Sequence, residues 1–260
     1  MARIPLSWRD SAIPAQRSAS RRTHRHAEGR LTVAGRRILV VDDEPQITRV
    51  LRTTLSSHGY EIRVANDAVA ALDVVNDWPP ELIITDLSMP DMSGVDLTRK
   101  VRAKSEVPII VLSVRGEERS KIEALDAGAD DYVTKPFSMS ELLARVRANL
   151  RRFTPPKPEE QEISVGDFKI DLPGHRVLVR GEEVRLTPKE FDLLVYFARH
   201  PDKVVTHAVL LRSVWGPQSV NQNEYLRVFI GQLRKKLEAG GDTHYILTEP
   251  WVGYRFAPGE

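Results

Sequence analysis

Residues 37–45 read RILVVDDEP, an apolar run followed at once by two acids and a proline. The run Ile38–Val41 has the length and the β-branched content of a buried strand. Asp42 and Asp43 follow where that strand would end, and Pro45 suits the first position of a helix. A buried strand that leads through acids into a helix predicts the first unit of an α/β sheet.

The same alternation continues to about residue 150. Amphipathic stretches separate the apolar runs, for example the face formed by Ile47, Leu51 and Leu55. Ser138 and Glu141 have the spacing of a helix capping box. Because strand and helix alternate five times, we predict a doubly wound, five-stranded parallel sheet with helices on both faces. The later predicted strands are Ile62–Ala65, Leu82–Thr85, Pro108–Leu112 and Asp131–Thr134.

A different pattern begins near residue 163. Short alternating strands are predicted between Ile163 and Leu186, and a β-hairpin is predicted from Tyr245 to Phe256. Three helical segments lie between them, near 188–199, 207–214 and 222–238. The second half is therefore predicted to be a separate, smaller α+β domain.

These patterns divide the chain into four parts. Residues 1–35 are rich in Arg and Ser without an apolar period, and we expect them to be disordered. Residues 36–152 form the α/β domain, 153–162 a proline-containing linker, and 163–258 the α+β domain. The first part is interpreted as a solvated tail, as residues added by an early start codon or by cloning, or as a targeting or nucleic-acid-binding arm.

Composition restricts the classes of function. The net charge of +2 comes from the N-terminal part, since residues 38–153 hold 15 basic against 19 acidic side chains. Global charge therefore does not indicate nucleic-acid binding. No apolar run approaches the roughly 20 residues that cross a bilayer, so we expect no membrane association. The chain has no cysteine, which fits a reducing compartment, and we expect a cytoplasmic protein.

Chemically active side chains follow the predicted strands of the first domain. Asp42 and Asp43 follow the first strand, Asp86 the third, Ser113 the fourth and Lys135 the fifth. Ligands of open α/β sheets bind at the carboxyl ends of the strands. Clustered carboxylates favour a hard cation such as Mg²⁺, and a carboxylate can act as a nucleophile toward phosphorus. The alternative is that each acid merely ends its strand on the surface.

Four motifs then identify a family resemblance: VVDDEP (40–45), ITDLSMPDMSG (84–94), VLS (111–113) and GADDYVTKPF (128–137). Residues 36–152 resemble the response-regulator receiver domain. The resemblance implies that Asp86 accepts a phosphoryl group from a sensor histidine kinase, with slow self-dephosphorylation. It implies a cis peptide bond before Pro136, and Val114 departs from the small residue usual at that position. The remaining implied roles are Mg²⁺ binding by Asp42, Asp43, Asp86 and the Ser88 carbonyl, and switching or phosphate contact by Ser113, Tyr132 and Lys135.

The charged segment from Lys121 to Arg152 suggests a second role. In the subfamily with winged-helix outputs, the fourth helix, fifth strand and fifth helix form a two-fold dimer face. The resemblance implies that phosphorylation favours a homodimer joined there. The alternative is a solvated, salt-laced surface that contributes little energy. The implied pairs across the face are Lys121–Glu141, Asp131–Arg145 and Asp130–Arg152.

The third helical segment of the second domain, residues 221–238, is locally basic. Its predicted buried stripe consists of Leu226, Phe229, Ile230, Leu233 and Leu237. Basic side chains lie off this stripe, and no acid occurs between Glu224 and Glu238. Such a face suits the major groove of DNA and its phosphates. The alternative is that this basic face of the helix is simply exposed to solvent.

Residues 163–256 resemble the winged-helix effector of the OmpR/PhoB-like subfamily, through LTPKEFDLL (186–194), VVTHAVLLRSVWG (204–216), LRKKLE (233–238) and GYRF (253–256). The resemblance implies promoter DNA as a partner, and RNA polymerase at the loop around 216–222. Trp251 at the hairpin tip packs either on the DNA backbone or, in the interpretation we favour, against its own domain. The implied DNA-binding residues are Arg227, Arg234, Lys235, Lys236 and Thr248.

Three outputs compete for the second domain. The runner-up is an enzyme or a protein-interaction module switched by phosphate. An enzyme would show its own constellation, but we find no Ser/His/Asp set, phosphate loop or metal-spaced histidines after residue 160. An RNA-binding antiterminator would be purely helical. We therefore predict a DNA-binding regulator rather than an enzyme. WGPQ (215–218) followed by YLR (225–227) is similar to regulators of Kdp-type potassium-uptake operons.

Overall fold

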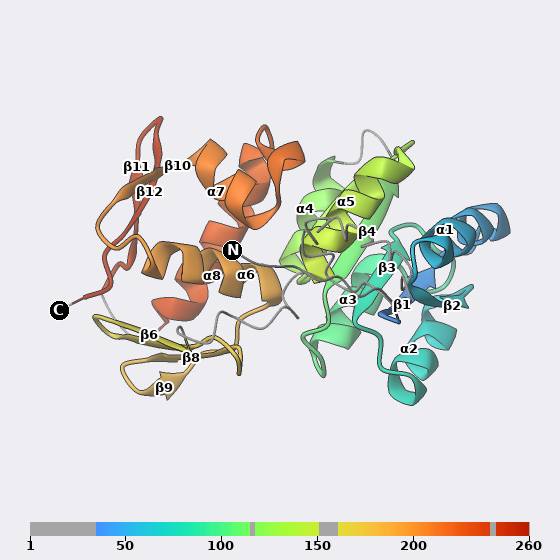
Figure 1. The fold of residues 1–260 in the computed structure, drawn as a ribbon, viewed down its shortest axis with the longest axis horizontal. Coiled ribbons are helices and arrows are strands. Elements are labelled where there is room, and N and C mark those ends of the chain that lie inside the picture. The colour runs from blue at the N-terminus through green and yellow to red at the C-terminus, as the bar shows by residue number, and fades with distance from the viewer. Residues whose placement is uncertain (1–34, 115–117, 151–160, 240–242, 260) are drawn as a thin grey trace, which may run out of the picture. The chain divides into compact units, whose positions relative to one another are not determined.

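The structure is a computed structural model and describes residues 35–114, 118–150, 161–239 and 243–259. Its first domain is an α/β sandwich, as predicted (Figure 1). Five parallel strands lie in the order β2-β1-β3-β4-β5. The strands are β1 (Arg37–Val41), β2 (Glu61–Ala65), β3 (Leu82–Asp86), β4 (Ile109–Val114) and β5 (Asp131–Lys135).

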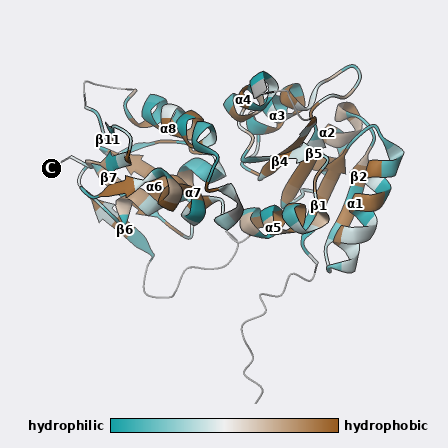
Figure 2. Cartoon of the chain, turned by 90° about the horizontal axis from the view of Figure 1, so that it is seen from above, coloured by the Kyte–Doolittle hydropathy of each residue, from teal (hydrophilic) through white to brown (hydrophobic). Residues whose placement is uncertain are grey.

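Alternate residues of the buried strands supply two hydrophobic layers, one on each face of the sheet. Ile38 and Val40 of β1 pack with α1 and α5, whereas Leu39 and Val41 pack with α2, α3 and α4. In Figure 2 the sheet is the most hydrophobic part of this domain. The helices are α1 (Pro45–Ser57), α2 (Ala68–Asp77), α3 (Gly94–Arg102), α4 (Glu118–Asp126) and α5 (Met139–Leu150).

One glycine fixes the loop that carries the acidic end of β3. The amide of Gly94, the first residue of α3, donates a hydrogen bond to the Leu87 carbonyl oxygen at 2.9 Å. A Cβ atom at Gly94 would overlap the carbonyl oxygen of Asp86. A side chain at this position would therefore displace the backbone that holds Asp86.

The second domain begins with an antiparallel four-stranded sheet in the order β6-β7-β8-β9 and ends with a three-stranded sheet in the order β10-β12-β11. Three helices lie between and against these sheets, so the α+β prediction is confirmed. The strands are β6 (Glu162–Val165), β7 (Phe168–Asp171), β8 (Arg176–Val179), β9 (Glu182–Glu183), β10 (Val204–Thr206), β11 (Ile246–Glu249) and β12 (Gly253–Phe256). The helices are α6 (Pro188–Ala198), α7 (His207–Val214) and α8 (Asn223–Leu237), with a 3₁₀ turn η2 (Pro217–Ser219).

A buried acid ties α6 to α8. Glu190, 1% exposed, accepts a hydrogen bond from the Thr187 amide at 2.6 Å and pairs with Lys236 Nζ at 2.6 Å. The carboxylate thus caps the start of α6 and neutralises a cation of α8. A buried carboxylate costs little free energy while both of its partners are in place. Removing it is costly, because a buried amide and a cation are then left without their acceptor.

We predict that Glu190→Ala lowers the free energy of unfolding of the second domain by about 2–3 kcal/mol, because it leaves the Thr187 amide and Lys236 without their acceptor. The measurement is the urea midpoint followed by circular dichroism. Glu182→Ala, an exposed acid of β9, is the matched control and should shift stability by less than about 0.5 kcal/mol. Equal midpoints for the two variants would contradict the role of Glu190.

Candidate phosphorylation site and DNA-binding surface

The acids and the lysine predicted at the strand ends of the first domain come together in one pocket. Lys135 Nζ, at the end of β5, lies 2.6 Å from Asp86 Oδ1 and 3.0 Å from Asp42 Oδ2. Asp42 and Asp86 are buried, at 0% and 6% exposure. One ammonium group therefore compensates two carboxylates contributed by β3 and the end of β1.

Backbone amides orient the two carboxylates. The Glu44 amide donates to Asp42 Oδ1 at 2.9 Å, and the Ser88 amide donates to Asp86 Oδ2 at 2.9 Å. Asp43, the third predicted acid, is exposed next to them. Each buried carboxylate thus has one oxygen held by an amide and the other by Lys135.

Burial raises the pKa of Asp42, and the Glu44 amide and Lys135 partly oppose that shift. Burial alone would lower the pKa of Lys135, but its hydrogen bonds to Asp86 and Asp42 outweigh burial and raise the pKa to about 12. Lys135 is therefore a permanent cation at neutral pH.

Ser113, at the end of β4, completes the pocket. Its hydroxyl is buried, and it has no hydrogen-bond partner among the described residues. A buried polar group without a partner is uncommon and indicates that it serves a ligand or another state of the protein. The predicted cis bond before Pro136 is present, and Val114, which follows Ser113, is 51% exposed.

The donor set of the pocket fits Mg²⁺. In the described ranges, no three His, Cys, Asp or Glu side chains are arranged to hold a metal by themselves. Mg²⁺, however, is usually held by one or two carboxylates, with waters and substrate oxygens completing the octahedron. The two buried carboxylates share a single cation, Lys135, and they provide hard oxygen atoms of the kind that Mg²⁺ prefers.

The described residues of the predicted dimer face have partners within this chain. Asp131, at the start of β5, pairs with Arg145 Nη1 of α5 at 2.8 Å, and both side chains are buried. Arg145 also pairs with Glu141 at 3.2 Å. The Lys121 ammonium lies 4.9 Å from the centre of the Tyr132 ring. Arg152, the remaining predicted residue, lies outside the described residues.

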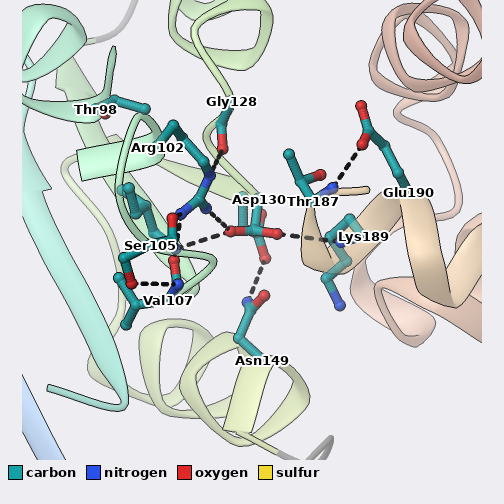
Figure 3. A network of polar contacts seen from close by, with 12 residues as sticks. Thr98, Arg102, Ser105, Val107, Gly128, Asp130, Asn149, Thr187, Lys189 and Glu190 are labelled. Carbon is teal, nitrogen blue, oxygen red and sulfur yellow. Dashed lines mark hydrogen bonds and ion pairs between the residues drawn. The ribbon is translucent and has the colours of Figure 1, made fainter. Parts of the chain in front are cut away.

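Asp130 is the centre of a second buried network (Figure 3). Its carboxylate accepts hydrogen bonds from Arg102 Nη2 and, at 2.9 Å, from the Ile109 amide. It also accepts a hydrogen bond at 3.1 Å from the amide of Lys189, which belongs to α6 of the second domain. Sequence reasoning assigned Asp130 to an intermolecular pair and did not find these partners.

The basic helix α8 has the buried stripe predicted for it, since all five apolar residues are at most 5% exposed. Tyr225, which that stripe omitted, is buried too. Its hydroxyl contacts the receiver-like domain rather than the core of its own domain. An aromatic residue beside an otherwise regular stripe was the available signal for a further contact.

The predicted DNA-binding side chains of α8 fall into two groups. Arg227 and Lys235 are exposed. Arg234 instead donates hydrogen bonds to the Ile246 carbonyl oxygen and, at 2.8 Å, to the hydroxyl of Thr248, which ties α8 to the hairpin. Lys236 pairs with the buried Glu190.

The hairpin β11–β12 has the predicted position, but the favoured interpretation of its tip is wrong. Trp251 is 100% exposed and has a φ of 66°. The turn at Glu249–Val252 carries the indole away from the sheet, so Trp251 does not pack against its own domain. A fully exposed tryptophan is instead available to an external partner.

Comparison with known proteins gives the family. Residues 38–147 match the model described as response regulator receiver domain, and residues 181–256 match the model described as transcriptional regulatory protein, C terminal. The chain belongs to the response-regulator family. It joins a receiver to a DNA-binding output domain of the OmpR/PhoB type.

Similar proteins cover both domains. The transcriptional regulatory protein KdpE of Mycobacterium tuberculosis is 47% identical over 84% of this chain and 98% of that protein. The DNA-binding response regulator MtrA of Mycolicibacterium smegmatis is 43% identical over 85% of this chain and 97% of that protein. The solved structure of a mutant of RitR has a TM-score of 0.70 at 28% identity, covering 86% of this chain and 100% of that one.

None of the helices in the described ranges is long and apolar enough to cross a membrane.

We predict that Lys135→Met destabilises the receiver by about 2–3 kcal/mol at pH 8, because two buried carboxylates are left without their cation. In the variant the folded-state pKa of Asp42 rises further above its unfolded value. The native state then binds more protons, so its stability increases as pH falls. The loss in free energy of unfolding caused by Lys135→Met, relative to the unsubstituted chain, should therefore become smaller as the pH is lowered from 8 to 5.

The measurement is the urea midpoint at both pH values. Lys104→Met, which replaces an exposed lysine, is the matched control and should show no such pH dependence. A difference for Lys135→Met that is constant or grows toward pH 5 would contradict the electrostatic role of Lys135.

Proposed function

We propose that this regulator accepts a phosphoryl group on Asp86 from a sensor histidine kinase, dimerises through its receiver and binds promoter DNA to control transcription. The observation that carries the proposal is the pocket in which Lys135 bridges Asp86 and Asp42 beside the unpartnered hydroxyl of Ser113. No other buried feature of the described residues combines a nucleophile, a cation and a free hydroxyl.

The transfer reaction uses these groups directly. A carboxylate oxygen of Asp86 attacks the phosphorus of phosphohistidine, the P–N bond breaks, and the imidazole nitrogen leaves with the electron pair and takes up a proton. The Lys135 ammonium stabilises the charge of the phosphoryl oxygens. The Ser113 hydroxyl donates a hydrogen bond to one of those oxygens once the phosphoryl group is in place.

Asp42, Asp43, Asp86 and the Ser88 carbonyl would hold Mg²⁺. When bound, Mg²⁺ neutralises charge on the transferring oxygens. In its absence, Lys135 is the cation that compensates the carboxylates of Asp42 and Asp86. The hydroxyl of Ser113 and the ring of Tyr132 would then report phosphorylation by moving inward, which favours the dimer face of α4, β5 and α5.

DNA recognition is assigned to α8 and the hairpin β11–β12. The exposed Arg227 and Lys235 are suited to phosphates or base edges of the major groove. Arg234 and Thr248 set the hairpin against α8, and Trp251 extends from its tip. Two domains joined in a receiver dimer would bind adjacent half-sites with increased effective concentration. The loop at 216–222 is the proposed contact for RNA polymerase.

The proposed target is a Kdp-type potassium-uptake operon. The relative named KdpE is 47% identical, compared with 43% for the relative named MtrA, and the WGPQ and YLR motifs support the same group. The test is gel retardation of a potassium-uptake promoter fragment and a scrambled fragment, with and without acetyl phosphate and Mg²⁺. Specific binding that tightens with phosphate is expected. Tightening only on a different promoter would discard the Kdp-type target, and no binding to any promoter DNA under phosphorylating conditions would overturn the DNA-binding function.

We predict that Asp86→Ala retains the fold but abolishes the stimulation of DNA binding by acetyl phosphate, because no nucleophile remains. The Kd for promoter DNA is measured by fluorescence anisotropy. Asp73→Ala, an exposed acid of α2, is the matched control and should be stimulated like the unsubstituted chain. Persistent stimulation of Asp86→Ala would contradict its assignment as the phosphoacceptor.

We predict that Arg227→Ala and Lys235→Ala each weaken DNA binding by about tenfold and leave phosphorylation unchanged. If either side chain binds a DNA phosphate, its removal should reduce the salt slope of binding by about one. Lys169→Ala, an exposed lysine of β7, is the control. If Arg227→Ala, Lys235→Ala and Lys169→Ala all bind DNA with the same Kd, α8 is not the DNA-reading helix.

A further inference from the structure

A cavity of about 490 Å³ lies in the receiver, between the carboxyl-terminal halves of α2 and α3. The loops that follow these two helices close it. Each helix returns the chain to the amino end of a parallel strand, so the carboxyl ends of α2 and α3 lie at the end of the sheet opposite to Asp86. This α2–α3 cavity is therefore separate from the phosphorylation pocket.

The walls of the α2–α3 cavity are mainly apolar. Leu72 and Val75 of α2 are only half-buried beside it, and Val101 of α3 lines it as well. Pro79 and Pro80, in the loop after α2, complete the apolar lining. An apolar group placed here would remove both its own surface and that of Leu72 and Val75 from water, which is favourable.

Two lysines give the cavity a positive rim. Lys100 and Lys104 are exposed and one helical turn apart, and the described residues that line the cavity include no acid. The neighbouring Arg99 pairs with Asp96 at 2.9 Å and with Glu123 at 3.2 Å. No described acid pairs with either lysine. The rim is therefore complementary to an anion.

A simpler role for these lysines would be to neutralise the carboxyl end of α3. The last carbonyl oxygens of that helix, however, already have donors. The Arg99 oxygen accepts a hydrogen bond from the Ala103 amide at 3.1 Å, and the Val101 oxygen accepts one from the Ser105 amide at 2.8 Å. The end of the helix thus leaves both ammonium groups available to a ligand.

Contacts outside the cavity hold both of its walls in place. On the α3 side, the Arg102 guanidinium donates hydrogen bonds to the Gly128 carbonyl oxygen at 2.8 Å and to the Val107 carbonyl oxygen at 2.6 Å (Figure 3). On the α2 side, the buried Trp78 ring, next to the two prolines, has the Arg63 guanidinium 4.8 Å from its centre. A cavity that is formed before its ligand arrives costs little ordering on binding.

We propose that the α2–α3 cavity binds a small amphiphilic molecule, whose apolar body contacts Leu72, Val75 and Val101 and whose single anionic head group pairs with Lys100 and Lys104. The volume lies in the range of about 300–1,000 Å³ that is usual for ligand cavities. The arginine-rich residues 1–34 of the chain itself do not match, because the rim would repel them. This site depends neither on phosphoryl transfer nor on DNA binding.

The test is a titration of the full chain with decanoate, kept below the concentration at which it forms micelles. Binding is followed by NMR through the amide signals of Val75 and Lys104. We expect saturable shifts at these signals. Decanol, which lacks the charge, and inorganic phosphate, which lacks the apolar body, should each bind at least about fivefold more weakly, since an exposed ion pair and the apolar contact each contribute modestly.

Two variants separate the rim from the walls. Lys100→Gln/Lys104→Gln should weaken decanoate binding about fivefold and leave decanol binding unchanged. Ala103→Phe keeps both lysines but puts a ring into the cavity, and it should abolish binding of both molecules. Ala103 is exposed and has a helical backbone conformation that any residue adopts, so the fold should persist, as circular dichroism can verify.

Lys169→Gln/Lys203→Gln is the matched control, because it removes the same charge from exposed positions of the output domain; it should bind decanoate like the unsubstituted chain. Equal weakening by the two double variants would overturn the role of the rim. Decanoate binding that survives in Ala103→Phe, or no saturable binding at all, would overturn the site. Self-association of the unsubstituted chain that Ala103→Phe abolishes would show that a second copy covers the cavity, and would overturn the small-molecule proposal.

Discussion

The arrangement of this regulator depends on the buried carboxylate of Asp131. A buried charge is costly unless it is paired and hydrogen-bonded. Arg145 of α5 neutralises it, and Tyr225 of α8 gives it a further hydrogen bond. Since α5 belongs to the receiver and α8 to the output domain, satisfying this one acid joins the two functions of the chain.

Strand β5 connects this acid to the phosphorylation pocket. Asp131 and Tyr132 begin the strand, and Lys135 ends it. Four residues of a strand span about 13 Å. The contact of Asp131 with Tyr225 and the phosphorylation pocket therefore lie at opposite ends of one short strand at the edge of the sheet. Phosphorylation of Asp86 would change the charge next to Lys135, and the effect would reach the contact with α8 along β5.

The sequence allowed prediction of the receiver fold, the pocket and the stripe of α8 because each depends on local pattern. Strand ends follow apolar periodicity, and parallel strands bring Asp42, Asp86 and Lys135 to one edge wherever the helices pack. The partners of Asp130 and Asp131 in the output domain were not predicted, because they come from segments 59 to 94 residues away. Nothing in local pattern distinguishes a carboxylate that pairs across a dimer from one that pairs with its own output domain. The exposure of Trp251 was misjudged for a related reason: tryptophan usually packs, but the turn that carries it points outward.

Two interactions compete for one face of the receiver. The face of α4, β5 and α5 binds the output domain in this structure, and a receiver dimer would use the same charged residues. A receiver dimer on this face would require the regulator to exchange one set of partners for the other, and the balance between them would set how much of the DNA-binding form exists before phosphorylation.

The most direct test of this exchange is the indole N–H of Trp215, one of four tryptophans in the chain. It donates to the Asp130 carbonyl oxygen and lies in the output domain, outside the proposed receiver dimer face. Its solvent exchange is measured by NMR in the full chain before and after phosphorylation with acetyl phosphate and Mg²⁺, with the signal assigned by Trp215→Phe. The account predicts slow exchange before phosphorylation and fast exchange after it. An indole that stays equally protected in the phosphorylated chain would contradict the release of the output domain.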